Sequence, residues 1–125
     1  MDTAPSDKKF ILIGEDNKLI ARVLSNKLQQ AGYDVTVASD GQEVLQSIAV
    51  RKPDLLLIDL IMPNKDGFTT LAELHANPDT KDIKVIVTSD LQQPEDIARV
   101  QQFGVLNFFD KANLQHIVEE VTHIL

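Results

Sequence analysis

Two stretches decide the fold: Phe10–Asp16 has the sequence FILIGED, and Leu55–Asp59 has the sequence LLLID. Each begins with four apolar residues and leads, at once or within three positions, to a carboxylate. An unbroken apolar run of this length is typical of a β-strand covered on both faces, as in a parallel sheet flanked by helices. The sequence therefore predicts two buried strands whose carboxyl ends carry acidic side chains.

Strand-like and helix-like segments alternate in both directions from these runs. A helix is expected to begin at Ser39, because Ser39-x-x-Gln42 resembles a capping box, and to end before Pro53. Such alternation predicts parallel strands with right-handed crossovers and helices on both faces, which is a doubly wound (βα)5 α/β fold. The other strands are expected over residues 33–37, 85–87 and 106–109, and the other helices over residues 17–30, 66–76, 94–103 and 113–125.

Composition narrows the classes of function. The 125 residues include no cysteine, which excludes disulfides and thiolate metal sites, and 19 acidic against 12 basic residues give a net charge of −7, which argues against direct nucleic-acid binding. The chain has no apolar run of the ~20 residues that a membrane span needs and no signal-peptide pattern, so a cytoplasmic protein without membrane contact is expected. The sequence leaves the oligomeric state open, with a monomer favoured. Residues 1–8 are expected to be a loose tail and residues 9–125 a single domain.

Functional groups follow four of the predicted strands. Glu15 and Asp16 come after the first strand, Asp59 after the third, Thr88 at the end of the fourth and Lys111 after the fifth. Sites in such sheets form at the carboxyl ends of the strands, so these groups should meet. Carboxylates packed together require a counter-charge, and oxygen ligands without His or Cys suit Mg²⁺. Together with a lysine and a hydroxyl, such a site can stabilise a phosphoryl group during transfer.

With these groups in place, the chain resembles the receiver domains of two-component response regulators, from about Lys9 to Leu125. The family has an acidic pair after the first strand, a phosphoacceptor aspartate after the third, a hydroxyl after the fourth, and a lysine after the fifth with an aromatic residue three positions before it. The matching residues are Glu15 and Asp16, Asp59 within IDLIMP (residues 58–63), Asp66-Gly67, Thr88, Phe108 and Lys111.

The resemblance implies a flavodoxin-like fold with strand order 2-1-3-4-5. It implies that Asp59 accepts a phosphoryl group from a phosphohistidine on a sensor histidine kinase or a phosphotransfer protein. The domain would thus catalyse its own phosphorylation and dephosphorylation rather than act as a conventional enzyme. Mg²⁺ would be held by Glu15, Asp16, Asp59 and the backbone carbonyl of Ile61, and Lys111 would pair with Asp59 or with the phosphoryl oxygens.

The resemblance also implies a switch. The hydroxyl of Thr88 would bind a phosphoryl oxygen, Phe108 would then turn into the space that Thr88 leaves, and a downstream protein target would read the altered surface. The short chain leaves no room for a separately folded output domain, which favours a stand-alone, chemotaxis-regulator-like receiver. The alternative is a receiver fragment of a larger response regulator.

One departure from the family pattern opens a further alternative. Ala112 follows Lys111 where the family usually has proline, often after a cis peptide bond. A cis bond before a residue other than proline costs ~2.5–4 kcal/mol, so the position of Lys111 could differ from the family's. This departure motivates the alternative of a receiver-like binding module that acts without phosphorylation.

Two other functions are possible on this fold: a flavin or nucleotide carrier and a metal-dependent phosphohydrolase. A flavin or nucleotide carrier lacks support, because Glu15 and Asp16 stand where a glycine-rich phosphate loop would follow the first strand. A metal-dependent phosphohydrolase lacks support because Ile61, rather than a second acid, stands two residues after Asp59.

Ile61 and Asp90 are expected to border the path of an attacking water.

Overall fold

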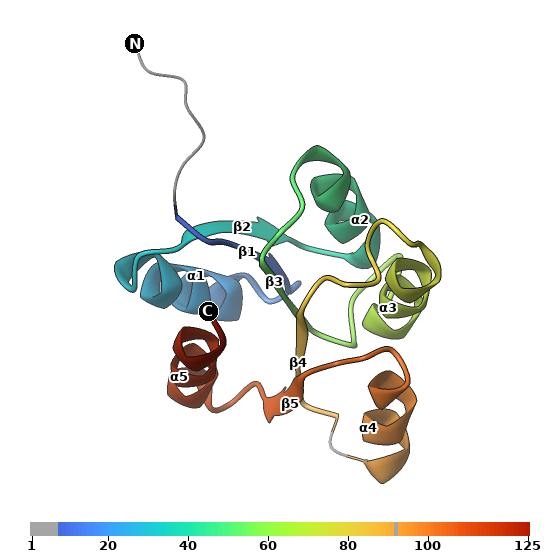
Figure 1. Cartoon of the computed structure of the whole chain (residues 1–125). Helices are drawn as coiled ribbons and strands as arrows, with labels where there is room; N and C mark the ends of the chain where they lie inside the picture. The colour runs from blue at the N-terminus through green and yellow to red at the C-terminus, as the bar shows by residue number, and fades with distance from the viewer. Residues whose placement is uncertain (1–7, 92) are drawn as a thin grey trace.

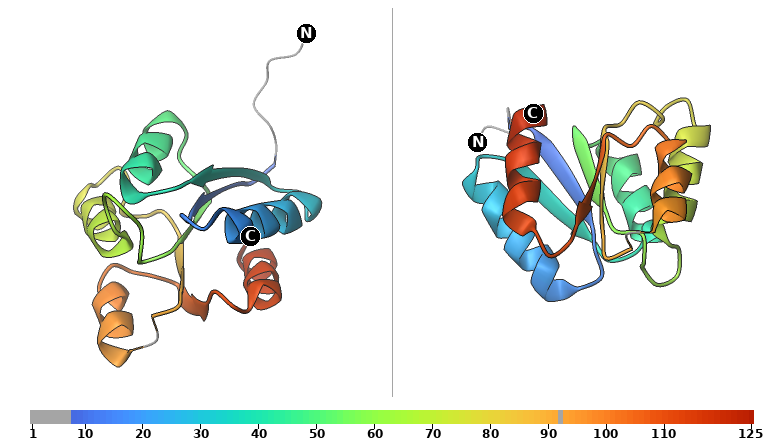
Figure 2. Two further views of the ribbon diagram at one scale, coloured as in Figure 1. Left: turned by 180° about the vertical axis from the view of Figure 1, so that it is seen from behind. Right: turned by 90° about the horizontal axis from the view of Figure 1, so that it is seen from below.

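The structure is a computed structural model that describes residues 8–91 and 93–125, and these form one five-stranded parallel sheet with helices on both faces (Figures 1 and 2). The strand order is β2-β1-β3-β4-β5, which confirms the predicted doubly wound fold. The strands are β1 (Phe10–Gly14), β2 (Asp34–Ala38), β3 (Leu55–Ile58), β4 (Val85–Ser89) and β5 (Asn107–Asp110). The helices are α1 (Lys18–Gln30), α2 (Gly41–Val50), α3 (Gly67–Ala76), α4 (Pro94–Gln101) and α5 (Leu114–Ile124).

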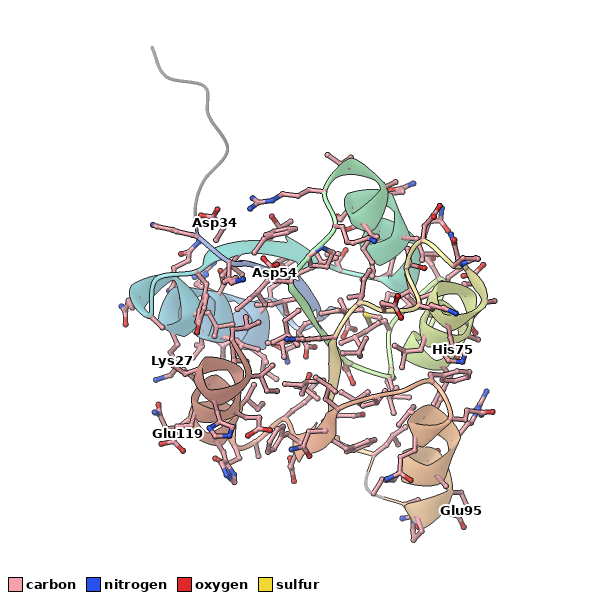
Figure 3. The ribbon with its side chains drawn as sticks, viewed as in Figure 1. Lys27, Asp34, Asp54, His75, Glu95 and Glu119 are labelled. Carbon is pink, nitrogen blue, oxygen red and sulfur yellow. The ribbon has the colours of Figure 1, made fainter. Side chains whose placement is uncertain are left out.

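Successive side chains of the central strands enter two separate cores. Leu56 and Ile58 of β3 pack under α2, α3 and α4, whereas Leu55 and Leu57 pack under α1 and α5. Side chains of a strand point alternately to its two faces, so a strand must be apolar throughout when helices cover both of them. Figure 2 shows the sheet between these two helical layers. In Figure 3 the charged side chains of Glu95 and Glu119 lie on the outer helical surface, away from both cores.

Several element boundaries differ from the prediction, among them the starts of α2 and β5 and the ends of α4 and β4, which continues to Ser89. The N-cap of α2 is Asp40 and not Ser39, because the Asp40 carboxylate accepts the Glu43 N–H at 2.8 Å while the Glu43 carboxylate accepts the Ser39 N–H at 3.0 Å. Helix α4 ends at Gln101 rather than Phe103, where i→i+3 hydrogen bonds tighten the last turn before Gly104 at φ +75°. Strand β5 starts at Asn107, one residue later than predicted.

Two predictions concern the chain as a whole. The loose tail was predicted over residues 1–8, of which residues 1–7 lie outside the described residues. Within the described part of the chain, no helix combines the length and the apolar character needed to cross a membrane.

Gly67 sets the distance between the end of β3 and the start of α3. Its N–H donates to the Leu60 carbonyl at 2.9 Å. A Cβ atom at this position would lie 2.7 Å from the Leu60 Cα and would collide with the Asp59 carbonyl oxygen. Since the obstructing atoms belong to the backbone, they cannot rotate away, and only glycine allows this close approach.

We therefore predict that Gly67→Ala lowers the free energy of unfolding by about 1–3 kcal/mol, the usual cost of overpacking. Helix propensity alone predicts the opposite change in stability, because it favours alanine over glycine by about 1 kcal/mol. Urea denaturation measures the change. The control is Thr69→Ala in the same helical turn, where the side chain is exposed and the effect should stay within about 0.5 kcal/mol. An equally stable or more stable Gly67→Ala variant would contradict this account.

Candidate functional site

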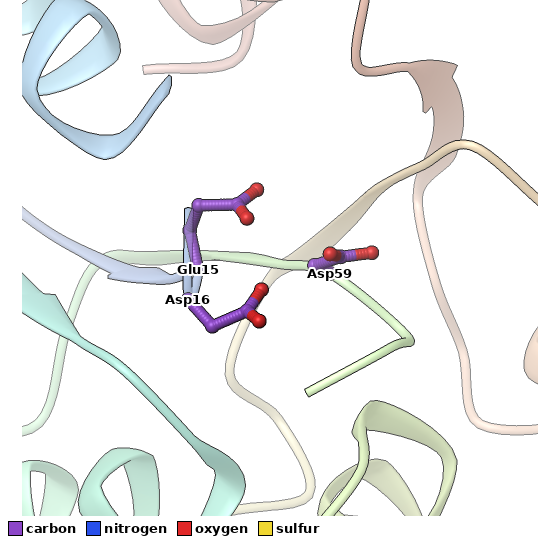
Figure 4. A group of neighbouring side chains, drawn as sticks. All are labelled: Glu15, Asp16 and Asp59. Carbon is purple, nitrogen blue, oxygen red and sulfur yellow. The ribbon is translucent and has the colours of Figure 1, made fainter. Parts of the chain in front are cut away.

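Three carboxylates gather at the carboxyl edge of the sheet. Glu15 and Asp16 follow β1 and Asp59 follows β3, and one oxygen from each lies within 4.8 Å of the others. Figure 4 shows the three side chains at the ends of these two strands. The strand register brings them together, because Gly14 pairs with Ile58 and the Asp59 N–H donates to the Gly14 carbonyl at 2.9 Å. The predicted convergence of the acidic residues is therefore present.

Lys111 bridges two of these carboxylates from the loop after β5. Its Nζ lies 2.9 Å from Asp59 Oδ2 and 3.1 Å from Glu15 Oε2. The Lys111–Ala112 peptide bond is trans, and the Asp110 carboxylate accepts the Ala112 N–H at 2.9 Å. Alanine in place of the family's proline therefore leaves the lysine in direct contact with Asp59.

The cluster has more negative than positive charge. Glu15 is only 3% exposed, and burial raises the pKa of its carboxyl, with the Asp59 charge adding to this, although the Asn17 N–H and Lys111 act in the opposite direction. Burial disfavours the Lys111 ammonium, but its hydrogen bond and attraction to Asp59, and then to Glu15, outweigh burial and raise its pKa. One ammonium thus faces three carboxylates. An all-oxygen donor set with excess negative charge fits Mg²⁺.

A cavity of about 270 Å³ opens beside the cluster. Ile61 stands at its rim with 57% of its surface exposed, and its N–H donates to Asp59 Oδ1 at 3.3 Å. A larger depression of about 500 Å³ lies between α2 and α3 and contains none of the predicted site residues. The residues that line the smaller cavity are Asp16, Asn17, Asp59, Ile61, Ser89, Asp90, Leu91 and Lys111.

Thr88 and Phe108 do not line this cavity. Thr88 is 4% exposed in β4 and pairs in register with Phe109 of β5. Phe108 is half-buried and packs against the core beneath α2, α3 and α4. The structure therefore brings Glu15, Asp16, Asp59, Ile61 and Lys111 together, whereas the two predicted switch residues lie outside the cavity lining.

Asn17 is a member of the site that the sequence analysis did not identify. Its backbone N–H donates to Glu15 Oε2 at 3.0 Å, while its side-chain oxygen caps α1 by accepting the N–H groups of Leu19 and Ile20. Asparagine is a favoured N-cap residue, so the sequence signals the cap. The sequence contains no comparable signal for the bond to Glu15.

The family model and the curated relatives that match this chain point to the same family. The family model described as the response regulator receiver domain matches residues 11–122. The DNA-binding dual master transcriptional regulator RpaA of Synechocystis sp. (strain ATCC 27184 / PCC 6803 / Kazusa) is 40% identical over 94 residues, which cover 74% of this chain and 38% of that protein. The chain spans between 22% and 44% of the length of the curated relatives that it matches.

Solved structures share the fold. The phosphorylated cyanobacterial phytochrome response regulator RcpA has a TM-score of 0.82 at 31% identity, with 94% of this chain and 91% of that chain covered. The Mn²⁺-bound form of response regulator Rcp1 has a TM-score of 0.82 at 27% identity, with 90% and 91% covered. Because the family match spans nearly all described residues and the fold agrees with these structures, the chain belongs to the response regulator receiver domain family of two-component signalling.

Proposed function

We propose that this receiver domain accepts a phosphoryl group on Asp59 in the presence of Mg²⁺ and signals through altered contacts with a protein target. The observation that carries the proposal is the group of three carboxylates within 4.8 Å, with Lys111 Nζ 2.9 Å from Asp59. The donor is a phosphohistidine on a sensor histidine kinase or a phosphotransfer protein. The relatives support this assignment because they include full response regulators.

In the proposed reaction, a carboxylate oxygen of Asp59 attacks the phosphorus atom and the bond from phosphorus to the donor histidine nitrogen breaks. Mg²⁺, held by Glu15, Asp16, Asp59 and the Ile61 carbonyl, would neutralise charge that develops on the phosphoryl oxygens. The Ile61 N–H and the Lys111 ammonium hold the two oxygens of Asp59 from different sides and so fix the orientation of the nucleophile.

The proposed switch requires movement. Thr88 is buried in β4 and does not line the cavity, so we propose that the end of β4 shifts toward Asp59 when the Thr88 hydroxyl binds a phosphoryl oxygen. Such a shift would open space beside the half-buried Phe108, which packs against the adjoining core. A local change of charge would thereby alter a surface near β5.

We also propose that the domain acts in the cytoplasm and that its direct partners are proteins. A net charge of −7 opposes contact with nucleic-acid phosphates. The DNA-binding named for the relative RpaA belongs to a protein of which this chain covers 38%. We therefore propose that the domain passes its signal on by binding another protein.

We predict that the chain gains the mass of one phosphoryl group when it is incubated with acetyl phosphate and Mg²⁺, and that Asp59→Asn abolishes the gain because the nucleophilic carboxylate is lost. Intact-protein mass spectrometry measures the product. Asp54→Asn is the matched control, since Asp54 precedes the same strand at its opposite, amino end and is exposed. A gain that survives Asp59→Asn, or no gain in the unaltered chain, would refute the proposal.

We further predict that Lys111→Met destabilises the metal-free chain by about 3 kcal/mol, because removing one partner of a buried pair leaves carboxylates without a counter-charge. Mg²⁺ should then raise the melting temperature of the variant more than that of the unaltered chain, since it supplies the missing charge. Thermal unfolding with EDTA and with Mg²⁺ measures both effects.

The control for this experiment is Lys65→Met. Lys65 pairs with Glu73, whose side chain is 48% exposed, so the loss should stay below about 1 kcal/mol and Mg²⁺ should act as on the unaltered chain. Equal Mg²⁺ shifts in Lys111→Met and in the unaltered chain would show that the lysine and the cation do not share this site.

A further inference from the structure

Asp40 is a buried carboxylate that belongs to neither the metal group nor the cavity. It is 7% exposed and lies at the start of α2. Its Oδ1 accepts the Glu43 N–H at 2.8 Å, and its Oδ2 accepts the side-chain amide of Asn64 at 2.7 Å. These two hydrogen bonds lower the pKa of the Asp40 carboxyl, so the group is charged at neutral pH. Capping of α2 accounts for the first bond but not for the second.

Asn64 lies in the loop between β3 and α3, which also carries Asp59 and Ile61. Its φ of +64° is the left-handed conformation, which asparagine tolerates better than most residues. Beside it, the Gly41 N–H of α2 donates to the Lys65 carbonyl at 2.9 Å. A Cβ atom at Gly41 would lie 2.5 Å from the Lys65 carbonyl oxygen, so helix and loop are in close contact here. The start of α2 therefore holds this loop by two adjacent hydrogen bonds.

The same turn also holds the acidic pair after β1. The Glu15 N–H donates to the Ala38 carbonyl at 2.9 Å, only two residues before Asp40. Residues 38–41 thus contact both parts of the site: Glu15 on one side and, through Asn64, the loop with Ile61 on the other. Within that loop, the Ile61 N–H donates to Asp59 Oδ1. Displacement of the loop would move both the Ile61 backbone and the support of the Asp59 carboxylate.

We propose that Asp40 and Asn64 are positioning residues for the metal and phosphoryl site. Their charge-assisted hydrogen bond fixes the loop after β3 relative to Glu15 and Asp16, so that the Ile61 backbone and the Asp59 carboxylate stay within reach of one cation. The inference rests on the proposed function, because it assumes that these groups bind Mg²⁺. In this proposal the turn 38–41 supplies no metal ligand, but it sets the spacing between the residues that do.

The test exchanges the two side chains. Asn64→Asp places two carboxylates opposite each other and should weaken Mg²⁺ binding by about 10-fold, the lower end of the range for residues that support metal ligands. Asp40→Asn should have a small effect, because the Asn64 amide can flip and accept from the new donor. In the double variant Asp40→Asn/Asn64→Asp, the new amide donates to the new carboxylate while its oxygen still caps α2, so most of the affinity should return.

Isothermal titration calorimetry of the full chain with Mg²⁺ gives the dissociation constants, and amide NMR spectra of the metal-free variants show whether each is folded. Should Asn64→Asp unfold, Asn64→Gly removes the same donor at a φ that glycine adopts freely, and a similar loss of affinity is expected. The control is Asp54→Ala, which deletes a carboxylate that accepts the Phe10 N–H at 2.7 Å at the amino edge of the sheet. It should lower stability without changing Mg²⁺ affinity.

Loss of affinity in folded Asn64→Asp and its rescue by the double variant would support the proposal, because a purely structural role predicts unchanged metal affinity in every variant that folds. Normal binding by the unaltered chain and equal binding by Asn64→Asp or Asn64→Gly would overturn this inference alone. Loss of affinity that the double variant fails to restore would also overturn it. Absence of Mg²⁺ binding by the unaltered chain would instead contradict the proposed function, and the inference with it.

Discussion

Repulsion among the carboxylates of Glu15, Asp16 and Asp59 is the constraint on which the site depends. The β1–β3 register forces them together, and burial of Glu15 raises the free energy of its charged form. Lys111 offsets part of that cost by contacting Glu15 and Asp59, and the Asn17 N–H offsets another part. In the proposed function, the remaining negative charge attracts a divalent cation, and a phosphoryl group on Asp59 changes the same charge balance. The repulsion among these carboxylates thus explains both the contacts of Lys111 and the proposed binding of a cation.

The scaffold holds this unfavourable arrangement through backbone contacts that leave little freedom. Gly67 lets α3 start directly against Asp59, and the Asp59 N–H bonds to the end of β1. The turn that begins α2 adds a second attachment through Asp40 and Asn64. Burial of apolar side chains in the two cores stabilises these contacts, because β1 and β3, which carry the three carboxylates at their ends, are buried throughout. The proposed switching movement would involve Thr88, which adjoins Asp59 in the β3–β4 register, and Phe108 of the neighbouring β5.

Local pattern predicted the strands and the acidic group but not the long-range side-chain contacts. The runs 10–13 and 55–58 are typical of strands covered on both faces, and the ends of these runs predicted where Glu15 and Asp59 lie. The start of α2 was misplaced by one residue because Ser39 and Asp40 are both good caps and have Gln42 and Glu43, respectively, three positions later. The Asp40–Asn64 bond joins residues 24 apart through a loop in left-handed conformation, which no periodicity encodes.

In the proposed function, this edge of the sheet directs a phosphoryl group to one carboxylate among three. The most direct measurement treats the chain with acetyl phosphate and Mg²⁺, reduces the product with borohydride, which converts an acyl phosphate to an alcohol, and locates the alcohol by peptide mass spectrometry. The account predicts reduction at Asp59 alone. An alcohol at Glu15 or Asp16, or no reduced residue in the chain, would contradict it.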